Sequence, residues 1–571
     1  MVVASLVERL WPLFDAAWIV HRDEDVIVID KPAGIPCQAV DAAKPDDLVT
    51  RLRSHIATER GVAADDVYVG IHQRLDRDTS GVLLYTLRPE ANASIAQQFE
   101  GRTVGKTYAA IVEPYGSDAD RVLEHTLAPA RAGGVRVAAR GDRRGKHART
   151  GLKVTERRGR RAQLELELHT GRKHQLRVQL AHEGSPIVGD RLYGSTAAPR
   201  LMLHAHRLRF THPGDGRELS FEAPVPAAFG RSLRTGASDG PIDPETFGDA
   251  LVHALRVRHP LGRAALESAP TTALRLLHGA AEGVPGVAVD VYDRFAVVHL
   301  SSPQAEAAEA ELLDRVAALG FEGVYLKRHP RQKNQLTPEV QAQLCPPQPV
   351  RGTAAPDPLV IRERAVPYAV RLGERFSTGI FLDQRDNRGR LAERAAGKRV
   401  LNLFAYTGGF SVAALQAGAT EAVCVDSSRA ALERAADNVA RIDASERHRT
   451  IAMDAFEALT MFARRSEVFD LVVLDPPSYA TAGKRRFVLT RDYAELCGLA
   501  LAVVAPGGAL LACVNHHGVS QQQLRRFVHT AGERAGVELT HLRDLPGQRD
   551  FPAEPGKEPI AKQLWATRGQ G

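Results

Sequence analysis

The chain has 571 residues, 44% of them hydrophobic and 25% charged. One hydrophobic core supports only about 250–300 residues, so we expect at least two large domains, and this composition excludes a mainly disordered or fibrous chain. A net charge of +7 mildly favours an anionic partner. Five scattered cysteines without a C-x-x-C pair argue against disulfides and a cysteine zinc site, and Pro506 breaks the longest apolar run. We therefore expect a cytoplasmic protein with no membrane partner.

Short apolar runs bounded by turn residues predict strands in the first part of the chain. These runs cover residues 26–30, 81–86, 107–112, 162–169 and 201–210. A polar segment rich in Gly, Pro and Asp follows, and we interpret residues 236–249 as a linker. The sequence therefore predicts an N-terminal domain over residues 1–235.

The part beyond this segment carries both helix and strand signals. Residues 250–370 begin with a helical stretch and continue with mixed signals, which predicts a small central α/β domain. In residues 371–571, apolar strands alternate with helices. The expected strands cover residues 400–404, 422–425, 450–452, 471–474 and 509–513. This alternation predicts a parallel sheet wound by right-handed crossovers.

Positive charge is concentrated between Arg131 and Arg177, where the chain has fifteen Lys and Arg residues against four acidic ones. A solvated charged loop is the ordinary explanation for such a run. Because this run leads into a candidate active-site motif, we favour a surface that grips the phosphates of a nucleic acid.

Six short motifs follow one another in the first half of the chain. They are D-K-P-A-G from Asp30, H-Q-R-L-D-R-D-T-S-G from His72, G-K-T-Y from Gly105, T-G-R-K-H-Q-L-R from Thr170, G-D-R-L-Y-G from Gly189 and L-H-A-H-R-L from Leu203. In this order they resemble the RluA-type pseudouridine synthases over residues 18–228. The resemblance implies a mixed, mainly antiparallel β fold and conversion of uridine to pseudouridine in RNA, with neither a cofactor nor a metal for this half.

The resemblance places the catalytic aspartate at Asp76. Breaking the N1–C1′ bond of uridine and rejoining the base through C5 requires a carboxylate that attacks C1′ or removes a ribose proton, and both routes stay open. Arg177 is expected to pair with Asp76, and Tyr108 to pack on the extracted base. Asp78 is a competing carboxylate that the family pattern disfavours. The target uridine must leave its stack, which implies base flipping.

A second set of motifs begins with L-N-L-F-A-Y-T-G-G-F-S at residues 401–411. A strand, a glycine turn and a helix let the backbone approach a nucleotide-like ligand closely. Acidic residues end the next strands: Asp426, placed to bond ribose hydroxyls, Asp454, next to the expected adenine site, and Asp475 in D-P-P-S-Y. This order resembles class I S-adenosylmethionine-dependent methyltransferases, and a dehydrogenase is disfavoured because G-x-G-x-x-G is absent. The resemblance implies S-adenosylmethionine as the cofactor, bound by the three acidic residues Asp426, Asp454 and Asp475 and by Phe404, Tyr406, Thr407, Gly408 and Phe410.

Residues 283–292 and 377–388 add a likeness to the RlmI/RlmK-type rRNA methyltransferases, over about residues 270–566. The resemblance implies a Rossmann-like catalytic domain in which Gln384 and Arg385 belong to a cofactor lid. It also implies RNA as the partner, with large-subunit rRNA favoured because these relatives act on it.

The residue at the end of the fifth strand bears on which base is methylated. Cytosine C5 is a poor nucleophile, so its methylation needs a cysteine that adds at C6. In the 5-methylcytosine relatives this cysteine stands eight residues after the first glycine of the turn at Gly507, where this chain has Asn515. Cys513 lies two residues earlier on the same strand face and stays a candidate. Asn515 resembles the guanine-N7 branch, with Asp475 positioning the flipped base, so we favour guanine and place cytosine next.

Two functional interpretations stay open. In the first, the chain is a bifunctional RNA-modifying enzyme; in the second, one half is active and the other is an RNA-binding module. A non-catalytic RNA scaffold fits poorly, and a small-molecule methyltransferase leaves the pseudouridine motifs unexplained. The residues that argue against a scaffold are Asp76, Arg177, Asp426 and Asp475.

Overall fold

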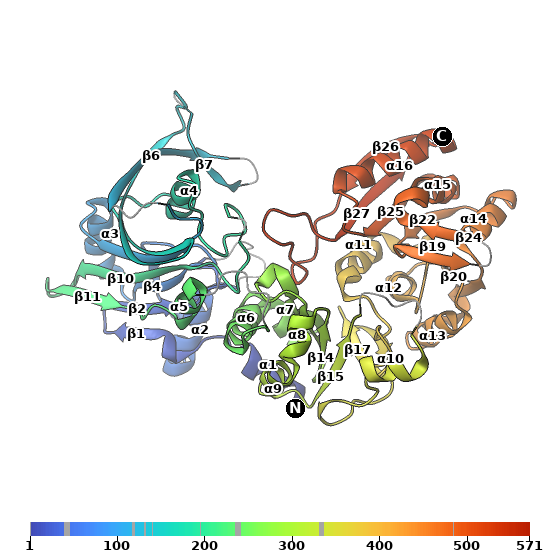
Figure 1. The fold of residues 1–571 in the computed structure, drawn as a ribbon, viewed down its shortest axis with the longest axis horizontal. Coiled ribbons are helices and arrows are strands. Elements are labelled where there is room, and N and C mark those ends of the chain that lie inside the picture. Colours follow the sequence, from blue (N-terminus) through green and yellow to red (C-terminus); the bar gives the residue numbers. More distant parts are fainter. Residues whose placement is uncertain are drawn as a thin grey trace.

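The computed structural model describes residues 2–38, 46–116, 120–130, 133–139, 141–194, 196–234, 241–330, 336–482 and 485–570. Three parts follow one another along the chain, and Figure 1 shows the small central part between the two larger ones. Within these ranges, no helix is both long and apolar enough to cross a bilayer. The five cysteines are buried, and none of them forms a disulfide bond.

An 11-stranded sheet forms the N-terminal part, in the order β1-β2-β4-β10-β5-β9-β8-β6-β7, with β11 beside β10 and β3 beside β4. Its strands are β1 (Ile19–Arg22), β2 (Val26–Lys31), β3 (Gly70–Ile71), β4 (Ser80–Thr86), β5 (Gly105–Val112), β6 (Arg121–Pro129), β7 (Val135–Val137), β8 (Lys146–Arg158), β9 (Arg161–Leu168), β10 (Leu203–Thr211) and β11 (Glu218–Glu222). β10 runs parallel to β4, whereas the other pairings in the described part of this sheet are antiparallel. The mixed, mainly antiparallel fold expected for this half is confirmed.

The main core of this part lies between the sheet and its helices. The helices are α2 (Leu48–Arg60), α3 (Asn92–Glu100), α4 (Gln175–His182) and α5 (Ala227–Arg234). Along β9 every second side chain, such as Leu164 and Leu166, is buried in the core, as a strand with one inward face requires. Ile56 of α2 and Leu180 of α4 pack into the same core. α4 is thereby fixed beside the loop that precedes β4.

The central part is built on a five-stranded sheet in the order β12-β13-β14-β15-β16. Its strands are β12 (Ala273–His278), β13 (Val287–Tyr292), β14 (Phe295–Leu300), β15 (Gly323–Arg328) and β16 (Arg351–Gly352), followed by the hairpin of β17 (Leu359–Glu363) and β18 (Val366–Val370). The helices are α6 (Pro244–Val257), α7 (His259–Arg263), α8 (Pro303–Ala307), α9 (Glu309–Ala317) and α10 (Pro338–Leu344).

Two boundaries differ from the sequence-based expectation. Helix α1 (Val2–Leu10), expected in the N-terminal domain 1–235, lies in the central core, because its apolar residues and Trp11 pack with Phe247 of α6. The linker expected at 236–249 is helical from Pro244, where the Asp243 carboxylate caps α6. Residues 235–240 lie outside the described part of the chain.

A seven-stranded sheet in the order β21-β20-β19-β22-β25-β27-β26 forms the C-terminal part. Its strands are β19 (Arg399–Leu403), β20 (Glu421–Asp426), β21 (His448–Ala452), β22 (Phe469–Leu474), β25 (Val504–Asn515), β26 (Leu539–Asp544) and β27 (Ala561–Arg568), with the hairpin of β23 (Tyr479–Ala482) and β24 (Arg485–Val488) beside it. The helices are α11 (Arg385–Ala395), α12 (Gly409–Gln416), α13 (Arg429–Ala440), α14 (Ala455–Arg464), α15 (Leu489–Ala502) and α16 (Gln521–Ala535). This Rossmann-like α/β fold was expected.

The first five strands of this sheet are parallel, and side chains on both of their faces are buried. In β19, Leu401 and Leu403 pack into one core cluster and Val400 into another, because helices cover both faces. The parallel sheet predicted from these five strands is confirmed, and β27 and β26 extend it with antiparallel pairings. β27 was not predicted from the sequence, because two of its first residues, Lys562 and Gln563, are polar.

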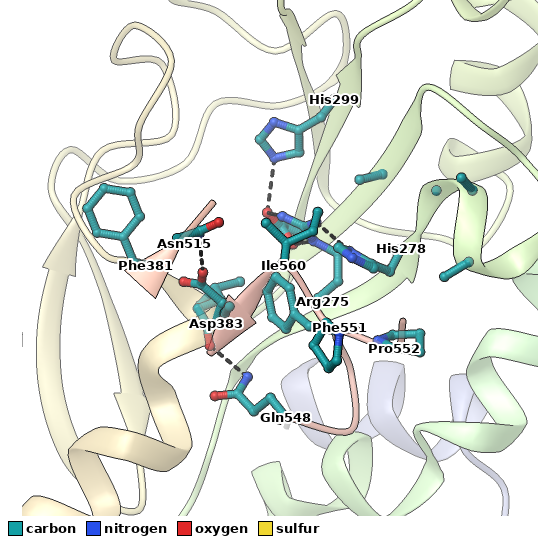
Figure 2. Close-up of a pocket in the computed structure, with 18 of the residues that line it drawn as sticks. Arg275, His278, His299, Phe381, Asp383, Asn515, Gln548, Phe551, Pro552 and Ile560 are labelled. Carbon is teal, nitrogen blue, oxygen red and sulfur yellow. Dashed lines mark hydrogen bonds and ion pairs between the residues drawn. The ribbon is translucent and has the colours of Figure 1, made fainter. Parts of the chain in front are cut away.

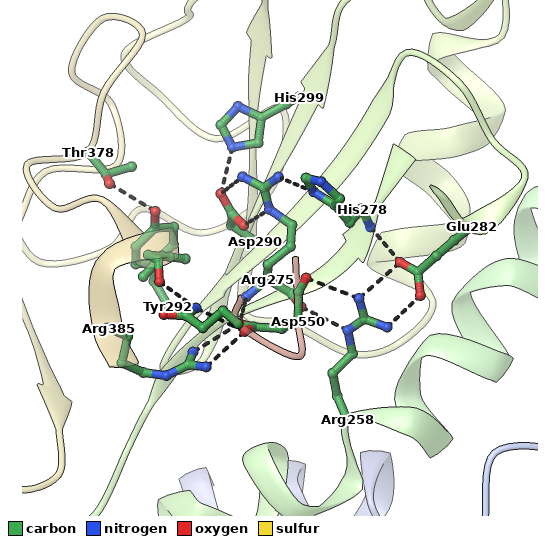
Figure 3. A network of polar contacts seen from close by, with 12 residues as sticks. Arg258, Arg275, His278, Glu282, Asp290, Tyr292, His299, Thr378, Arg385 and Asp550 are labelled. Atoms are coloured by element: carbon green, nitrogen blue, oxygen red, sulfur yellow. Dashed lines mark hydrogen bonds and ion pairs between the residues drawn. The ribbon is translucent and has the colours of Figure 1, made fainter. Parts of the chain in front are cut away.

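A buried network of charged side chains joins the three parts, and Figure 3 shows its centre. Arg258 donates to both carboxylate oxygens of Glu282 and, at 3.2 Å, to the carbonyl oxygen of Asp550. The Asp550 carboxylate accepts two bonds from Arg385, at 2.9 and 2.8 Å. Arg191 of the N-terminal part lies 3.9 Å from Glu282 Oε1. These paired charges fix α11 and the loop around Asp550 against the central part.

Candidate active sites

A buried lysine holds the loop that carries Asp76. Lys31, at the end of β2, donates from Nζ to the carbonyl oxygen of Arg77 at 2.9 Å. Burial lowers the pKa of Lys31 to about 8. On the other side of Asp76, the backbone N–H of Leu75 donates to Cys37 Sγ at 3.3 Å. The backbone on both sides of Asp76 is therefore fixed by the protein.

Arg177 and Asp76 are brought together as the sequence predicted. Arg177 Nη1, from α4, donates to Asp76 Oδ2 at 2.9 Å. Its Nε and Nη2 donate to the two carboxylate oxygens of Asp190 at 2.7 and 2.8 Å, and the Asp190 side chain is fully buried. Burial alone would lower the pKa of Arg177, but Asp190 and then Asp76 raise it. Asp190 was missed as a functional residue, although its G-D-R-L-Y-G motif was recognised.

Asp76, Arg177 and Tyr108 line one cleft of about 1140 Å³. Tyr108 comes from β5, and burial, followed by the Asp76 charge, raises the pKa of its hydroxyl. Further cationic side chains line the same cleft: Arg74, Arg77, Arg102, Lys106, Arg172 and Lys173. Cations around the Asp76 carboxylate would attract a polyanion such as RNA.

Asp78, the carboxylate that competes with Asp76 in the sequence, does not line the cleft. Asp78 forms an ion pair with Arg77 at 3.1 Å and lies near His253 of the central part, outside the residues that line the described cleft. Burial would raise the pKa of Asp78, but Arg77 and His253 lower it to about 2. A structural role between the two parts accounts for these contacts.

The histidines of the same motifs are bonded to protein groups. His204 lies 2.7 Å from Ser80 Oγ, and burial lowers the pKa of His204 to about 4. His174 Nδ1 lies 2.8 Å from the Tyr193 hydroxyl. Across the described residues, no group of three or more His, Cys, Asp or Glu side chains is arranged to hold a metal.

The turn after β19 has a strained backbone typical of a ligand-binding loop. Phe404 and Tyr406 have φ angles of 56° and 49°, a left-handed conformation that residues other than glycine rarely adopt. The backbone N–H of Tyr406 donates to Asp426 Oδ2 at 2.9 Å, which ties the end of β19 to that of β20. Gly408, with a φ of 76°, starts α12. These residues surround the backbone amides that would face a bound nucleoside.

The remaining predicted cofactor residues differ in their surroundings. Thr407 donates to the carbonyl of Gly379 and Phe410 is buried, so both stabilise the turn from behind. Asp454 caps α14, accepting from the Phe456 N–H at 2.9 Å. The structure thus shows Asp454 as a helix cap, and its contact with the adenine of the cofactor stays a prediction.

Gln384 and Arg385 are both buried and bonded within the protein. Gln384 Oε1 accepts from Asn387 at 2.6 Å, and the Arg385 guanidinium is held by Asp550. These contacts make the two residues anchors of the segment before α11. Cofactor binding by either side chain stays a prediction that these contacts do not favour.

Three polar residues meet where β22 and β25 end. Asn515 Nδ2 donates to Asp383 Oδ2 at 2.9 Å, and Ser478 Oγ of the D-P-P-S-Y loop donates to the Asn515 carbonyl at 3.0 Å. Burial, and then the neighbouring Asp383, raise the pKa of Asp475 to about 7. Burial also raises the pKa of Asp383. Asp383 was missed, although the D-Q-R string that it opens was singled out.

Cys513, the alternative residue for cytosine methylation, is fully buried below this group. Its Sγ lies 3.9 Å from Gln384 Oε1 and 3.9 Å from Asn387 Nδ2. Burial raises the pKa of the Cys513 thiol well above its ordinary value. A neutral thiol is a weak nucleophile, so this geometry opposes a covalent role for Cys513.

Comparisons with known proteins match both halves. The family model of RNA pseudouridylate synthase matches residues 25–182, and that of S-adenosylmethionine-dependent methyltransferase matches residues 352–556. Ribosomal RNA large subunit methyltransferase I of Aeromonas salmonicida is 32% identical over 54% of this chain and 77% of its own length. The protein of the same name from Serratia proteamaculans is 35% identical over 49% and 69%.

Two solved structures resemble parts of the chain. SMU.776, complexed with SAH, is 24% identical, covers 63% of this chain and 87% of its own, and has a TM-score of 0.49. Human RNA Pseudouridylate Synthase Domain Containing 4 is 24% identical over 40% of this chain and 95% of its own, with a TM-score of 0.33. On the sequence relatives and the two family models, the chain belongs to the ribosomal RNA large subunit methyltransferase family and joins its S-adenosylmethionine-dependent methyltransferase domain to an RNA pseudouridylate synthase domain.

Proposed function

We propose that the chain is a bifunctional enzyme that forms pseudouridine in RNA in its N-terminal part and methylates a guanine base in its C-terminal part. The observation that carries this proposal is the Asp76–Arg177–Asp190 arrangement in a cation-lined cleft, in the same chain as the Asp426-bonded turn. The names of the curated relatives support large-subunit rRNA as the substrate. Free, buried cysteines suit a reducing cytoplasm.

In the synthase part, Arg177 keeps the Asp76 carboxylate ionised and directs it into the cleft. The carboxylate acts on the ribose of the flipped uridine, either as a nucleophile at C1′ or as a base. Tyr108 keeps its proton, because its pKa is raised, and offers a flat ring against which the freed uracil turns. Asp190 positions Arg177 and does not touch the substrate.

In the methyltransferase part, the turn at Tyr406 and the carboxylate of Asp426 hold the nucleoside of the methyl donor, with Asp454 near its adenine. S-Adenosylmethionine, when bound, supplies an electrophilic methyl group. Asp475 and Asn515 orient the target base so that a ring nitrogen faces this group. The strained backbone of the turn supports this fit, because such conformations persist where they serve binding.

Guanine is favoured over cytosine because of the residues beside the expected methyl group. A guanine nitrogen has its own lone pair and needs no covalent adduct, which suits Asn515. Cytosine C5 would need a thiolate, and Cys513 is a buried, neutral thiol.

Tritium release tests the division of labour directly. RNA labelled at C5 of uridine should lose tritium to water with or without S-adenosylmethionine, since the synthase part needs no cofactor. Labelled methyl groups should enter the same RNA only when labelled S-adenosylmethionine is supplied. If either signal is missing, the alternative of a single activity with an RNA-binding module replaces the proposal.

The cofactor site is tested by Asp426→Ala. The change removes a carboxylate that accepts ligand hydrogen bonds and holds the Tyr406 turn. Loss of about 1–3 kcal/mol corresponds to roughly 5–150-fold weaker binding of S-adenosylmethionine by calorimetry. Pseudouridine formation by the same variant serves as the folding control. Unchanged binding would rule out this pocket.

A further inference from the structure

A cavity of about 570 Å³ lies between the central and C-terminal parts, apart from the turn at Tyr406. Its walls come from β12–β14, from residues 376–383, and from the loop before β27 together with the first residues of that strand. Figure 2 shows Phe381 and Asn515 on one side of it and His278 and His299 on the other. Its volume lies within the roughly 300–1,000 Å³ typical of small-molecule sites.

One end of the cavity lies next to the D-P-P-S-Y loop that follows β22. Asn515 and Asp383 line this end, and the Asn515 carbonyl accepts the bond from Ser478 of D-P-P-S-Y. The wall at Ser377 is shared with the cofactor turn, because Tyr406 donates to Ser377 Oγ at 3.1 Å. A base in this cavity would therefore lie next to the turn at Tyr406, which is proposed to hold the methyl donor.

The cavity wall carries an aromatic ring that is exposed and not packed in the core. Phe381 is 53% exposed, and its ring centroid lies 5.5 Å from that of Tyr406. A large exposed apolar side chain in a concave wall indicates a binding surface. Nucleobases stack on such rings, which provides affinity without requiring a particular base.

Two polar side chains beside this ring supply base selectivity. The Watson–Crick edge of guanine presents two adjacent donors, N1–H and N2–H, which one carboxylate can accept together. Asp383 lines the cavity, and its Oδ2, which accepts the bond from Asn515, has a second lone pair. The Asn515 amide has a carbonyl oxygen that can accept a further donor.

The floor of the cavity is held rigid. Arg275 forms an ion pair with Asp290, and its guanidinium lies 4.7 Å from the ring centroid of Phe551. Asp550, next to Phe551, is fixed by its two bonds from Arg385. A preformed floor limits the ordering cost when a base enters.

We propose that this cavity receives the target guanine nucleotide after it flips from the RNA, with Phe381 stacking on the base and Asp383 and Asn515 reading its Watson–Crick edge. This inference rests on the proposed methyltransferase function and adds the substrate site to it. Phe381 and Asp383 are thereby binding residues that set specificity.

The test uses the full-length protein saturated with S-adenosylhomocysteine and measures binding of the four nucleoside monophosphates by NMR saturation transfer. GMP should bind better than CMP, AMP or UMP. Phe381→Ala should weaken GMP binding roughly 5–150-fold, the range for loss of one stacked base, while Phe381→Tyr should restore it. Asp383→Asn should remove the preference for GMP, because the amide replaces one acceptor with a donor.

Two further readouts separate this inference from the proposed function. Calorimetry with S-adenosylmethionine should give the same affinity for Phe381→Tyr as for the wild type, because the ring beside Tyr406 is kept, and the KM for RNA in methylation should rise in Phe381→Ala. No preference for GMP in the wild type, or GMP binding that neither variant changes, overturns the cavity proposal even if RNA is methylated. Absence of cofactor binding or methylation in the wild type contradicts the proposed function instead.

Discussion

Asp76 lies in a site whose neighbours are fixed by the fold. Lys31 anchors the loop, and Asp190 holds two nitrogens of Arg177 so that the third points at the Asp76 carboxylate. Such preorganisation lowers the cost of placing charge where the reaction needs it. The motifs predicted the roles of Asp76 and Arg177, whereas the contact of Asp190 with Arg177 became visible only in the fold.

We expect Asp76→Asn to abolish pseudouridine formation, because an amide is neither a nucleophile nor a base. RNA affinity and methylation should stay near the wild-type values. The pseudouridine content of RNA after a single turnover checks this. Arg177→Lys is a comparison that keeps the positive charge but cannot bond Asp76 and Asp190 at the same time in the way the guanidinium does. A normal rate in Asp76→Asn would show that another carboxylate acts.

Asp475 should give methylation a pH dependence. Its pKa is raised to about 7 by burial and by the Asp383 charge. If the carboxylate form orients the base, the single-turnover methylation rate rises with pH through an inflection near 7. Asp383→Asn removes a like charge, so the inflection should move to lower pH. A flat profile, or an inflection that does not move, contradicts this role.

Local sequence patterns determined most individual elements but not their long-range pairing. Runs such as Val26–Ile29 and Leu471–Leu474 are apolar enough to predict buried strands on their own. β27 was missed because its pairing with β25 is made across about fifty residues and its first positions are polar. α1 was expected in the N-terminal part but packs in the central part, because its apolar residues predict that it is buried without indicating in which core.

The pairing of β4 with β10 depends on Gly81. This residue has a φ of +116°, and a Cβ there would lie 2.2 Å from the Ala205 carbonyl oxygen. Gly81→Ala should therefore separate the two strands, shift the Asp76 loop, and reduce both the melting temperature and pseudouridine formation. Gly61→Ala is the matched control, since Gly61 has a φ of +65° with nothing within 4 Å and should cost only about 1–2 kcal/mol. Equal effects of both changes, measured by calorimetry, would contradict this reading.

At the scale of the whole molecule, positively charged side chains gather in and beside the Asp76 cleft, where RNA is proposed to bind. The stretch between Arg131 and Arg177 includes the exposed C-terminal end of β8, and Arg172 and Lys173 line the Asp76 cleft. Neutralising Arg143, Arg144, Arg157 and Arg158 together should flatten the slope of log K against log[salt] by up to a few units if each contacts a phosphate. Filter binding over a salt series measures this slope. An unchanged slope would make the stretch a solvated charged surface.

The three parts are also joined physically, since Arg191 and Glu282 meet where the synthase and central parts touch, and Asp550 continues the contact to the methyltransferase part. Neither the linker composition nor any motif predicted this contact. It packs the synthase and methyltransferase parts against the same central part.

The central claim is that one chain performs both modifications. Mass spectrometry of nucleosides from RNA of a deletion strain, treated with purified protein with and without S-adenosylmethionine, measures both products at once. We predict new pseudouridine in both conditions and a methylated guanosine only with S-adenosylmethionine. Absence of either product would contradict the bifunctional account, and 5-methylcytidine that disappears in Cys513→Ala would overturn the assignment of guanine.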